Sequence, residues 1–265
     1  MMNKSKLKMS MVLLVVGLVI GFFPTVAMAA TNASKPKRKL MAGAYALPIT
    51  PNTDEFGIPI NPDGSTVFLA GFGGPASRPA SAVHDDVWIR SLILEYDGTM
   101  IIFVALDLIG YSIDQVYEVK EEVEDEYGIM ADNIIIATTH THSGPDTLGL
   151  WTGTIPGVNW PYMEYIRGEI VESIVQAYQN MEKARLRFGS TSVPGLMKNS
   201  RDPGRVYPDL EVMKVEDRRG DTIATMINYA GHPEVLVSNN LEITSDYVGY
   251  LRDKVEEELG GVAIF

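Results

Sequence analysis

Two apolar segments separated by a tight turn constrain the fold of this chain most. Residues 88–95 and 100–107 are rich in β-branched and other apolar side chains, and Asp97-Gly98 stands between them. An Asp-Gly pair in this position is a strong hairpin signal, because both residues adopt the positive φ angles of the favoured two-residue turn at low cost. We therefore expect an antiparallel pair of strands here.

Helical and strand-like patterns alternate along the rest of the chain. Ser112 is placed to cap a helix that runs to Tyr127 and ends at Gly128. We expect its buried stripe to comprise Ile113, Val116, Val119, Val123 and Tyr127. A second helix begins at Pro161, and its buried side should carry Tyr165, Ile166, Ile170, Ile174, Val175 and Tyr178. A third helix is expected from about Ser245 to Leu259, packing through Val248, Leu251, Val255 and Leu259.

Several further segments read as strands. We expect them at residues 40–49, 133–138, 185–188, 211–215 and 222–229, the first as an edge strand because Pro51 follows it. Hairpins mixed with intervening helices predict a layered α/β domain with a mixed β-sheet and flanking helices over residues 40–265. Val262-Ala263-Ile264-Phe265 resembles the opening of a buried strand, so we expect the domain to be incomplete at its C-terminus.

The N-terminus carries an export signal. Lys4, Lys6 and Lys8 precede an apolar run from Met11 to Phe23, and Ala27-Met28-Ala29 then supplies small residues at the spacing that a signal peptidase recognises. The run is shorter than the roughly 20 residues of a membrane-spanning helix. We expect a signal peptide over residues 1–30, a flexible lead-in over 31–39, and a secreted or periplasmic protein.

Composition excludes some classes of protein. The chain has no cysteine, so disulfide bonds cannot stabilise it, and its net charge is −12. A protein this acidic repels phosphate groups, so we expect no nucleic-acid partner.

Two of the four histidines stand in one short segment, Thr139-His140-Thr141-His142-Ser143-Gly144-Pro145. If the preceding strand stays extended, His140 and His142 leave the same face about 7 Å apart at their Cα atoms. Both can ligate one ion, or one can ligate while the other hydrogen-bonds to a bound water or substrate. The pattern alone leaves both arrangements open.

His232 is the natural third imidazole. It follows an apolar stretch and precedes Pro233, which repeats the strand, histidine and proline order seen at His140–Pro145. A zinc site with three protein ligands and one open position makes a nucleophile available at neutral pH. This combination predicts a metal-dependent hydrolase.

Other polar segments give weaker signals. His84-Asp85-Asp86 could hold a hard cation, although two acids in a loop are usually only solvated. Arg201, within Asn199-Ser200-Arg201-Asp202-Pro203, could neutralise a developing oxyanion, although an exposed arginine is the commoner meaning. Ser143 and Ser245 lack a nucleophile elbow, and residues 71–75 form a glycine-rich turn that matches no nucleotide-binding pattern.

An ordered series of motifs resembles the neutral ceramidase family, the neutral/alkaline non-lysosomal ceramidases, over Ala42 to Phe265. The series comprises Ala42-Gly43 through Ile49-Thr50-Pro51, Gly71-Phe72-Gly73, His84-Asp85 with Arg90, Asp107-Leu108, Ala137 to Pro145, Asn228 to Pro233, and Ser245-Asp246 with Gly249-Tyr250. The resemblance implies a zinc-dependent amidohydrolase that converts ceramide into sphingosine and a fatty acid.

The resemblance also implies roles for individual residues. His140 and His232 look like the two zinc-ligating histidines, and His142 looks like the neighbouring group that positions substrate or stabilises the oxyanion. Arg201 is similar to the family's site arginine, although its loop departs from the usual pattern. The implied substrate is a lipid or another amide, met at a membrane surface.

The family's catalytic serine, and the Glu and Tyr that complete its zinc shell, would follow Phe265, so we expect a C-terminally truncated chain. Two alternatives stay open beside the ceramidase reading. One is a related hydrolase of another amide or ester, and the other is a non-catalytic exported fragment.

Overall fold

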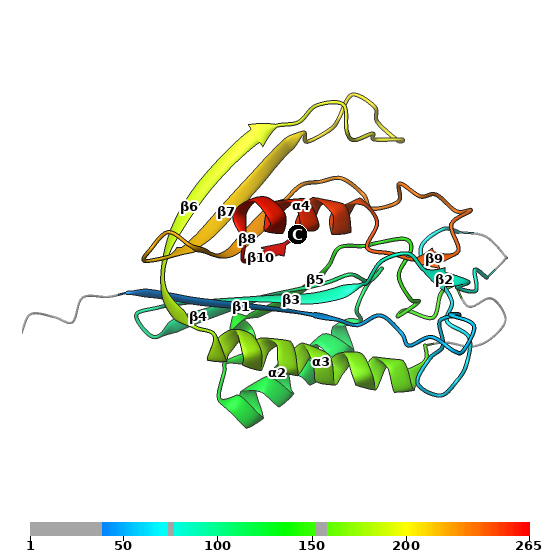
Figure 1. Ribbon diagram of the computed structural model, residues 1–265, viewed down its shortest axis with the longest axis horizontal. Helices are drawn as coiled ribbons and strands as arrows, with labels where there is room; N and C mark the ends of the chain where they lie inside the picture. The colour runs from blue at the N-terminus through cyan, green and yellow to red at the C-terminus, as the bar shows by residue number, and fades with distance from the viewer. Residues whose placement is uncertain (1–38, 74–76, 152–157) are drawn as a thin grey trace, which may run out of the picture. The chain divides into compact units, whose positions relative to one another are not determined.

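The structure, a computed structural model, describes residues 39–73, 77–151 and 158–265 (Figure 1). The expected signal peptide at 1–30 and nearly all of the expected lead-in at 31–39 lie outside the described residues. The account below concerns the compact unit that begins at Arg38. None of its described helices is long and apolar enough to cross a membrane.

Eight strands form one mixed sheet in the order β10-β8-β7-β6-β1-β3-β4-β5. They are β1 (Leu40–Pro48), β3 (Trp88–Tyr96), β4 (Thr99–Leu106), β5 (Ile134–Thr138), β6 (Glu182–Ser192), β7 (Asp209–Asp217), β8 (Thr222–Asn228) and β10 (Val262–Ile264). Pairing is parallel between β4 and β5 and between β8 and β10, and antiparallel elsewhere. Two short strands, β2 (Ala82–Val83) and β9 (Glu242–Ile243), form a separate parallel pair. The predicted α/β class with a mixed sheet is confirmed.

The hairpin at Asp97-Gly98 forms as predicted. Strands β3 and β4 pair from Ile89↔Leu106 to Tyr96↔Thr99, and both turn residues have positive φ angles, 57° at Asp97 and 81° at Gly98. Its two strands place apolar side chains on both faces of the sheet, so the hairpin lies at the centre of the core.

One strand prediction is wrong, because β1 is an interior strand with β3 on one side and β6 on the other. Strand β6 pairs with β1 only through Met41↔Lys183 and Ala42↔Glu182. Pro48, at the far end of β1, therefore never has to donate a hydrogen bond to β6. The proline signal indicated where the strand ends, and it did not indicate an edge.

The helices are α2 (Ile113–Tyr127), α3 (Trp160–Gln179) and α4 (Tyr247–Leu259), with a 3₁₀ turn η1 (Ala131–Asn133) before β5. Ser112 caps α2 in a reciprocal capping box with Gln115, and Gly128 ends it with a φ of 68°. The predicted stripe is correct at its centre, where Val119 and Val123 are fully buried. It is wrong at its ends, because Ile113 and Tyr127 are exposed where the helix extends past the core.

The other two helices also match the prediction in their centres. Ile166, Ile170 and Ile174 of α3 are fully buried, whereas Tyr165 and Tyr178 are exposed. In α4 Val248 is buried and Leu259 is exposed. Tyrosine keeps its hydroxyl near water more readily than isoleucine tolerates exposure, so the aromatic positions were the less certain members of the stripe.

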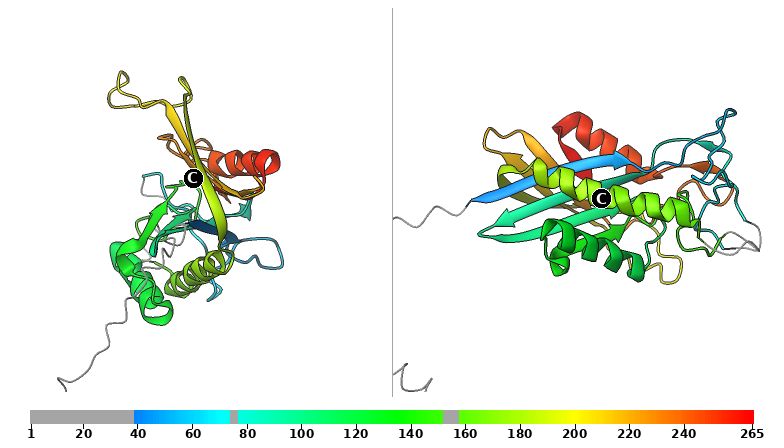
Figure 2. Two further views of the ribbon diagram at one scale, coloured as in Figure 1. Left: turned by 90° about the vertical axis from the view of Figure 1, so that its left-hand side faces the viewer. Right: turned by 90° about the horizontal axis from the view of Figure 1, so that it is seen from below.

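The sheet curls so that its two halves share a second core. Helices α2 and α3 cover one face of β1, β3 and β4 (Figure 1). On the opposite face, Ala42, Leu92 and Ala105 pack against residues of the other half, namely Val215 of β7, Ala224 of β8 and Ile264 of β10. Figure 2 shows the β6–β7 hairpin rising out of the curled sheet. The curl brings the loops after β5 and β8 together.

Candidate metal centre

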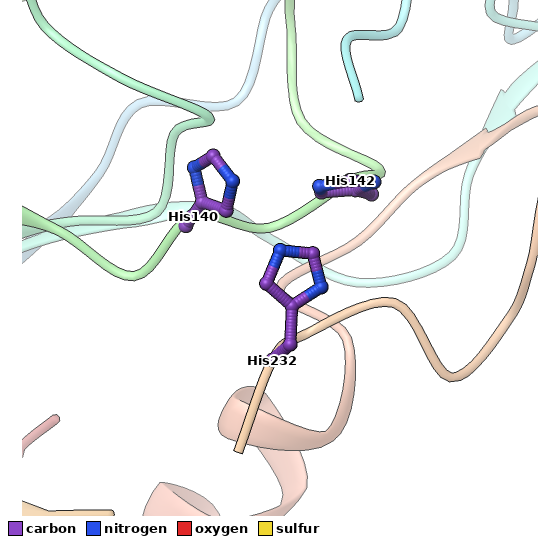
Figure 3. Close-up of side chains that lie close together, drawn as sticks. All are labelled: His140, His142 and His232. Atoms are coloured by element: carbon purple, nitrogen blue, oxygen red, sulfur yellow. The ribbon is translucent and has the colours of Figure 1, made fainter. Parts of the chain in front are cut away.

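Three histidines from these two loops converge on one point (Figure 3). His140 and His142 follow β5, and His232 follows β8. Their ring centroids lie 5.1 Å apart for His140 and His142, 4.9 Å for His140 and His232, and 4.5 Å for His142 and His232. One ring nitrogen of each lies within 4.8 Å of one nitrogen of the others. In the part of the chain that the structure describes, no second cluster of this kind occurs.

The backbone reaches this arrangement by a turn, and the predicted extended path through His140 to His142 is wrong. Strand β5 ends at Thr138, and His140 has a φ of 66°, in the left-handed region. Such a conformation costs a non-glycine residue about 1–2 kcal/mol. Hydrogen bonds hold it, because the His140 amide donates to Leu108 O at 3.0 Å and the Thr139 amide donates to Leu106 O at 2.9 Å.

Neighbouring oxygens fix the rings of His140 and His232. His140 Nδ1 lies 2.5 Å from the carbonyl oxygen of Ile109, so this nitrogen carries the proton and donates it. His232 Nδ1 lies 3.2 Å from Glu234 Oε2. In both residues Nε2 is then the free lone pair. A carbonyl or carboxylate behind the imidazole is the usual support of a metal-ligating histidine.

His142 has a different environment. Its side chain is buried, and neither ring nitrogen has a hydrogen-bond partner. Burial lowers the pKa of His142 to about 4, with smaller contributions from His232, His140 and Arg78. The ring is therefore neutral at pH 7 and offers one N–H donor and one lone pair to whatever enters the cluster.

The loop at residues 71–78 holds His142 in place. The Phe72 ring meets His142 edge to face at 4.8 Å, and Arg78 donates to His142 O at 2.8 Å. The backbone of Gly71 passes so close that an added Cβ would lie 2.4 Å from His142 Cγ, and its φ is 114°. The His142 amide donates to Pro233 O at 3.0 Å, which ties the two histidine loops to each other.

The end of β4 supports the cluster from below through Asp107, which is fully buried. Arg252 of α4 donates to both of its carboxylate oxygens, at 2.8 and 2.5 Å. Thr139 Oγ1 donates to Asp107 Oδ1 at 3.3 Å, and the Trp88 amide donates to Oδ2 at 3.0 Å. Asp107 thus fixes the residue that immediately precedes His140.

The residues present fit a zinc ion. Zinc is bound by neutral imidazoles at about 2.0–2.1 Å, and three histidines with an open fourth position are a known catalytic set. The buried and unpartnered nitrogens of His142 would otherwise each leave a desolvated polar group without compensation. Small movements of the three rings bring their nitrogens within reach of one ion.

Other predicted site residues lie apart from the three histidines. His84 Nδ1 pairs with Asp85 Oδ2 at 2.7 Å, and Asp85 accepts hydrogen bonds from Thr244 and Ser245. His84 and Asp85 therefore tie β2 to the start of α4. Arg201 lies in the exposed loop between β6 and β7 and lines a groove together with His232.

Neither predicted serine lies free in the site. Ser143 is buried and its hydroxyl accepts from Asn240 at 3.0 Å, while Ser245 Oγ lies 2.5 Å from Asp86 O. Asp246, rather than Ser245, caps α4. These contacts agree with the absence of a nucleophile elbow in the sequence.

Sequence reasoning missed three residues of the site. Glu234 reaches His232 and also lies 3.8 Å from His142 Nδ1, and its place two residues after His232 was a usable signal. Gly71 and Phe72 were read only as a tight turn near a site, and Arg78 was not considered. No local pattern points from residues 71–78 to His142, because that contact depends on the fold.

Two grooves meet at the cluster. The first, of about 990 Å³, has an apolar lining that includes Phe103, Ile135, Phe188, Met213, Met226 and Ile264, and it ends at His140 and His232. The second, of about 880 Å³, contains Lys198, Arg201, Arg205 and Glu234. Both share the segment from Tyr229 to His232. The histidines therefore stand where an apolar space meets a charged one.

The chain was compared with known proteins. The family model described as neutral/alkaline non-lysosomal ceramidase, N-terminal, matches residues 64–264. A neutral ceramidase of Pseudomonas aeruginosa is 24% identical over 78% of this chain and 34% of its own length. Neutral ceramidase B of Dictyostelium discoideum is 23% identical over 74% of this chain and 30% of its own length. The chain thus spans about a third of the length of these relatives.

Solved structures share the fold. The crystal structure of the neutral ceramidase from Pseudomonas aeruginosa superposes with a TM-score of 0.73, at 21% identity, over 87% of this chain and 38% of that one. A ceramidase complexed with C2 gives the same TM-score at 22% identity, over 86% of this chain and 37% of its own. The family match covers most of the chain and includes all three histidines, and so the chain belongs to the neutral/alkaline non-lysosomal ceramidase family, whose N-terminal region it matches.

Proposed function

We propose that this chain is the histidine-bearing part of a zinc-dependent amidohydrolase that acts on N-acyl lipids, with ceramide cleaved to sphingosine and a fatty acid. Family membership supports the reaction class, and the solved ceramidase in complex with C2 supports a ligand at this fold. The observation that carries the proposal is the position of the three histidines at the end of an apolar groove. An acyl chain can lie in that groove while its amide reaches the cluster.

The roles of the residues follow from their environments. His140 and His232 would hold the zinc ion through Nε2, because Ile109 O and Glu234 occupy their Nδ1 sides. A bound zinc ion supplies a Lewis acid for the amide carbonyl. Neutral His142 would donate its N–H to the oxygen that gains negative charge, and burial keeps this donor free of competing water.

Arg201 has a supporting role in this proposal. It lines the groove that continues from His232 away from the apolar space, on an exposed loop. Its guanidinium can neutralise negative charge near the cluster, which is the role that the family resemblance implies. We treat it as a substrate-positioning residue, because no other group ties its side chain to the histidines.

Chelator-sensitive turnover is the direct test. Purified protein is loaded with zinc and incubated with N-acyl lipids, and free fatty acid is measured with and without a chelator. We expect release that the chelator abolishes, that H140A and H232A abolish, and that H84A retains. Absence of chelator-sensitive release from every N-acyl lipid contradicts the proposed activity.

Zinc binding measured on the same samples separates the alternatives. Zinc binding without turnover favours the non-catalytic exported fragment. Turnover of other amides or esters but not of ceramide favours a related hydrolase. Zinc binding lost in H140A and H232A but retained in H84A supports the proposed ligands whichever substrate is cleaved.

Export is proposed from the sequence alone. The basic start, the apolar run to Phe23 and Ala27-Met28-Ala29 support removal of residues 1–30 and a secreted or periplasmic location. Mass spectrometry of the protein recovered from a secreting host should show a new N-terminus near Ala30 or Thr31. Recovery of the uncleaved chain in the cytosol contradicts export.

A further inference from the structure

The second groove differs in charge from the rest of the molecule. The chain carries a net charge of −12, yet this groove gathers Lys198, Arg201 and Arg205 beside His232. Its one acidic lining residue is Glu234, whose carboxylate is directed at His232 and His142. A concentration of cations within an acidic protein attracts anions locally.

Two of these cations are available to a ligand. Within the described residues, neither Lys198 nor Arg201 has an ion-pair partner. Arg205 pairs with Asp202 at 3.1 Å, but both side chains are exposed, at 85% and 55%, so this pair contributes little. An incoming anion therefore displaces at most one weak ion pair.

The loop that carries the cations is ordered by its own hydrogen bonds. Asn199 Oδ1 accepts from the amides of Arg201 and Asp202, each at 3.0 Å, and Asn199 Nδ2 donates to Arg205 O at 2.9 Å. Val193 donates to Pro208 O at 2.8 Å across the base of the loop. The backbone thus holds the three cations on one side of the groove, above the end of the β6–β7 hairpin (Figure 1).

The two grooves meet at His232 and together are bipartite. One side is apolar, with Phe103, Phe188 and Met226 in its lining, and the other is cationic. A ligand that fits both has an acyl chain at one end and an anion at the other, with its amide between them at the histidines. A neutral head group would leave the cations without a partner.

We propose that the cationic groove selects N-acyl amides whose amine portion carries an anionic group, such as a carboxylate or a sulfonate. The inference rests on the proposed amidohydrolase function and narrows its substrate class. Lys198, Arg201 and Arg205 are the specificity-determining residues. They act through charge complementarity, which is strongest at low ionic strength.

Binding measured without turnover tests the proposal. The probes are N-octanoylglycine, which is anionic, and N-octanoylethanolamine, which has the same acyl amide and a neutral head. Calorimetry on the zinc-loaded full chain should show about tenfold tighter binding of the anionic probe at low salt, as expected of one or two charge-assisted hydrogen bonds. The preference should shrink as salt is added. N-acetylglycine, which lacks the acyl chain, should bind more weakly than N-octanoylglycine.

Matched variants locate the effect. K198Q/R201Q/R205Q should lose the preference while keeping its affinity for the neutral probe. K39Q/K183Q/R218Q removes the same charge from exposed positions outside this groove and should keep the preference. A preference that survives the first variant, for example through carboxylate binding to zinc, overturns the proposal. Equal loss in both variants, or no preference in the unmodified protein, also overturns it.

The outcome is independent of the catalytic test. Preferential binding of the anionic probe without hydrolysis would support the charged groove and count against the proposed activity. Hydrolysis without any preference would support the activity and overturn the inference about the head group.

Discussion

Arg252 and Asp107 form a buried bidentate ion pair that joins α4 to the end of β4, with both side chains at most 1% exposed. Replacing Arg252 by methionine keeps most of the side-chain volume and leaves the Asp107 carboxylate buried without its partner. Breaking such a pair on one side destabilises a protein by about 3–5 kcal/mol. Urea denaturation of R252M should show a loss of this size in the free energy of unfolding.

Lys254 on the same helix provides the control. It is 62% exposed and pairs only with Glu257 and Glu258 at the surface. K254M should therefore change the free energy of unfolding by less than about 1 kcal/mol. Similar losses in R252M and K254M would show that the buried pair does not stabilise the fold.

Gly71 is required by the position of His142. In G71A the new Cβ would meet the imidazole at 2.4 Å, and the φ of 114° is strained for alanine. We expect destabilisation of about 1–3 kcal/mol and weaker zinc binding, measured by thermal unfolding and by zinc titration. Gly73, two residues on, has nothing within 4 Å of its added Cβ, so G73A should behave like the unmodified protein. Normal zinc binding by G71A would contradict the close contact.

Glu234 should tune zinc affinity without abolishing it. Its carboxylate supports the Nδ1 side of His232 at 3.2 Å. Loss of such a supporting group typically weakens metal binding about 10–100-fold. Competition with a chromophoric chelator should show this decrease for E234Q, and a larger one for H232A. Exposed Glu211, which contacts Tyr207 and Asn228 but none of the three histidines, supplies the control E211Q. Equal zinc affinity of E234Q and E211Q would remove Glu234 from the site.

His142 should make the metal-free protein lose stability as the pH falls. Its pKa is about 4 in the folded protein against an ordinary value of 6.5, so between these values the unfolded chain binds a proton that the folded one does not. Stability is full above pH 6.5 and declines towards pH 4, by at most about 3 kcal/mol from this residue. Urea midpoints of H142Q and of the unmodified protein, both in chelator, should converge on acidification. A constant difference between them would contradict the lowered pKa.

Local chemistry made much of the fold predictable. Asp97-Gly98, Ser112 and Gly128 each encode a turn or a helix end in the residues themselves, and all three act as expected. The position of β1 was not predictable in this way, because Pro51 reports only on its own neighbourhood and not on the strand that pairs with the other end of β1.

The site was predictable in composition but not in geometry. His140, His142 and His232 could be grouped because each follows a strand-like segment, and the structure brings them together. The left-handed turn at His140 could not be read, because no glycine or asparagine marks it and tertiary hydrogen bonds to Leu108 maintain it. The supports of His142 come from residues 71–78, which lie far from it in sequence.

The curl of the sheet gives the three histidines a mechanical meaning. The two halves of the sheet are joined through only two residue pairs between β1 and β6, Met41↔Lys183 and Ala42↔Glu182. His140 belongs to one half and His232 to the other. An ion gripped by both would act as a clasp on the side opposite this narrow hinge, closing a long loop of chain whose freedom the unfolded protein would otherwise regain. The width of the apolar groove, and with it the thickness of the acyl chain that can enter, would then depend on whether the clasp is fastened.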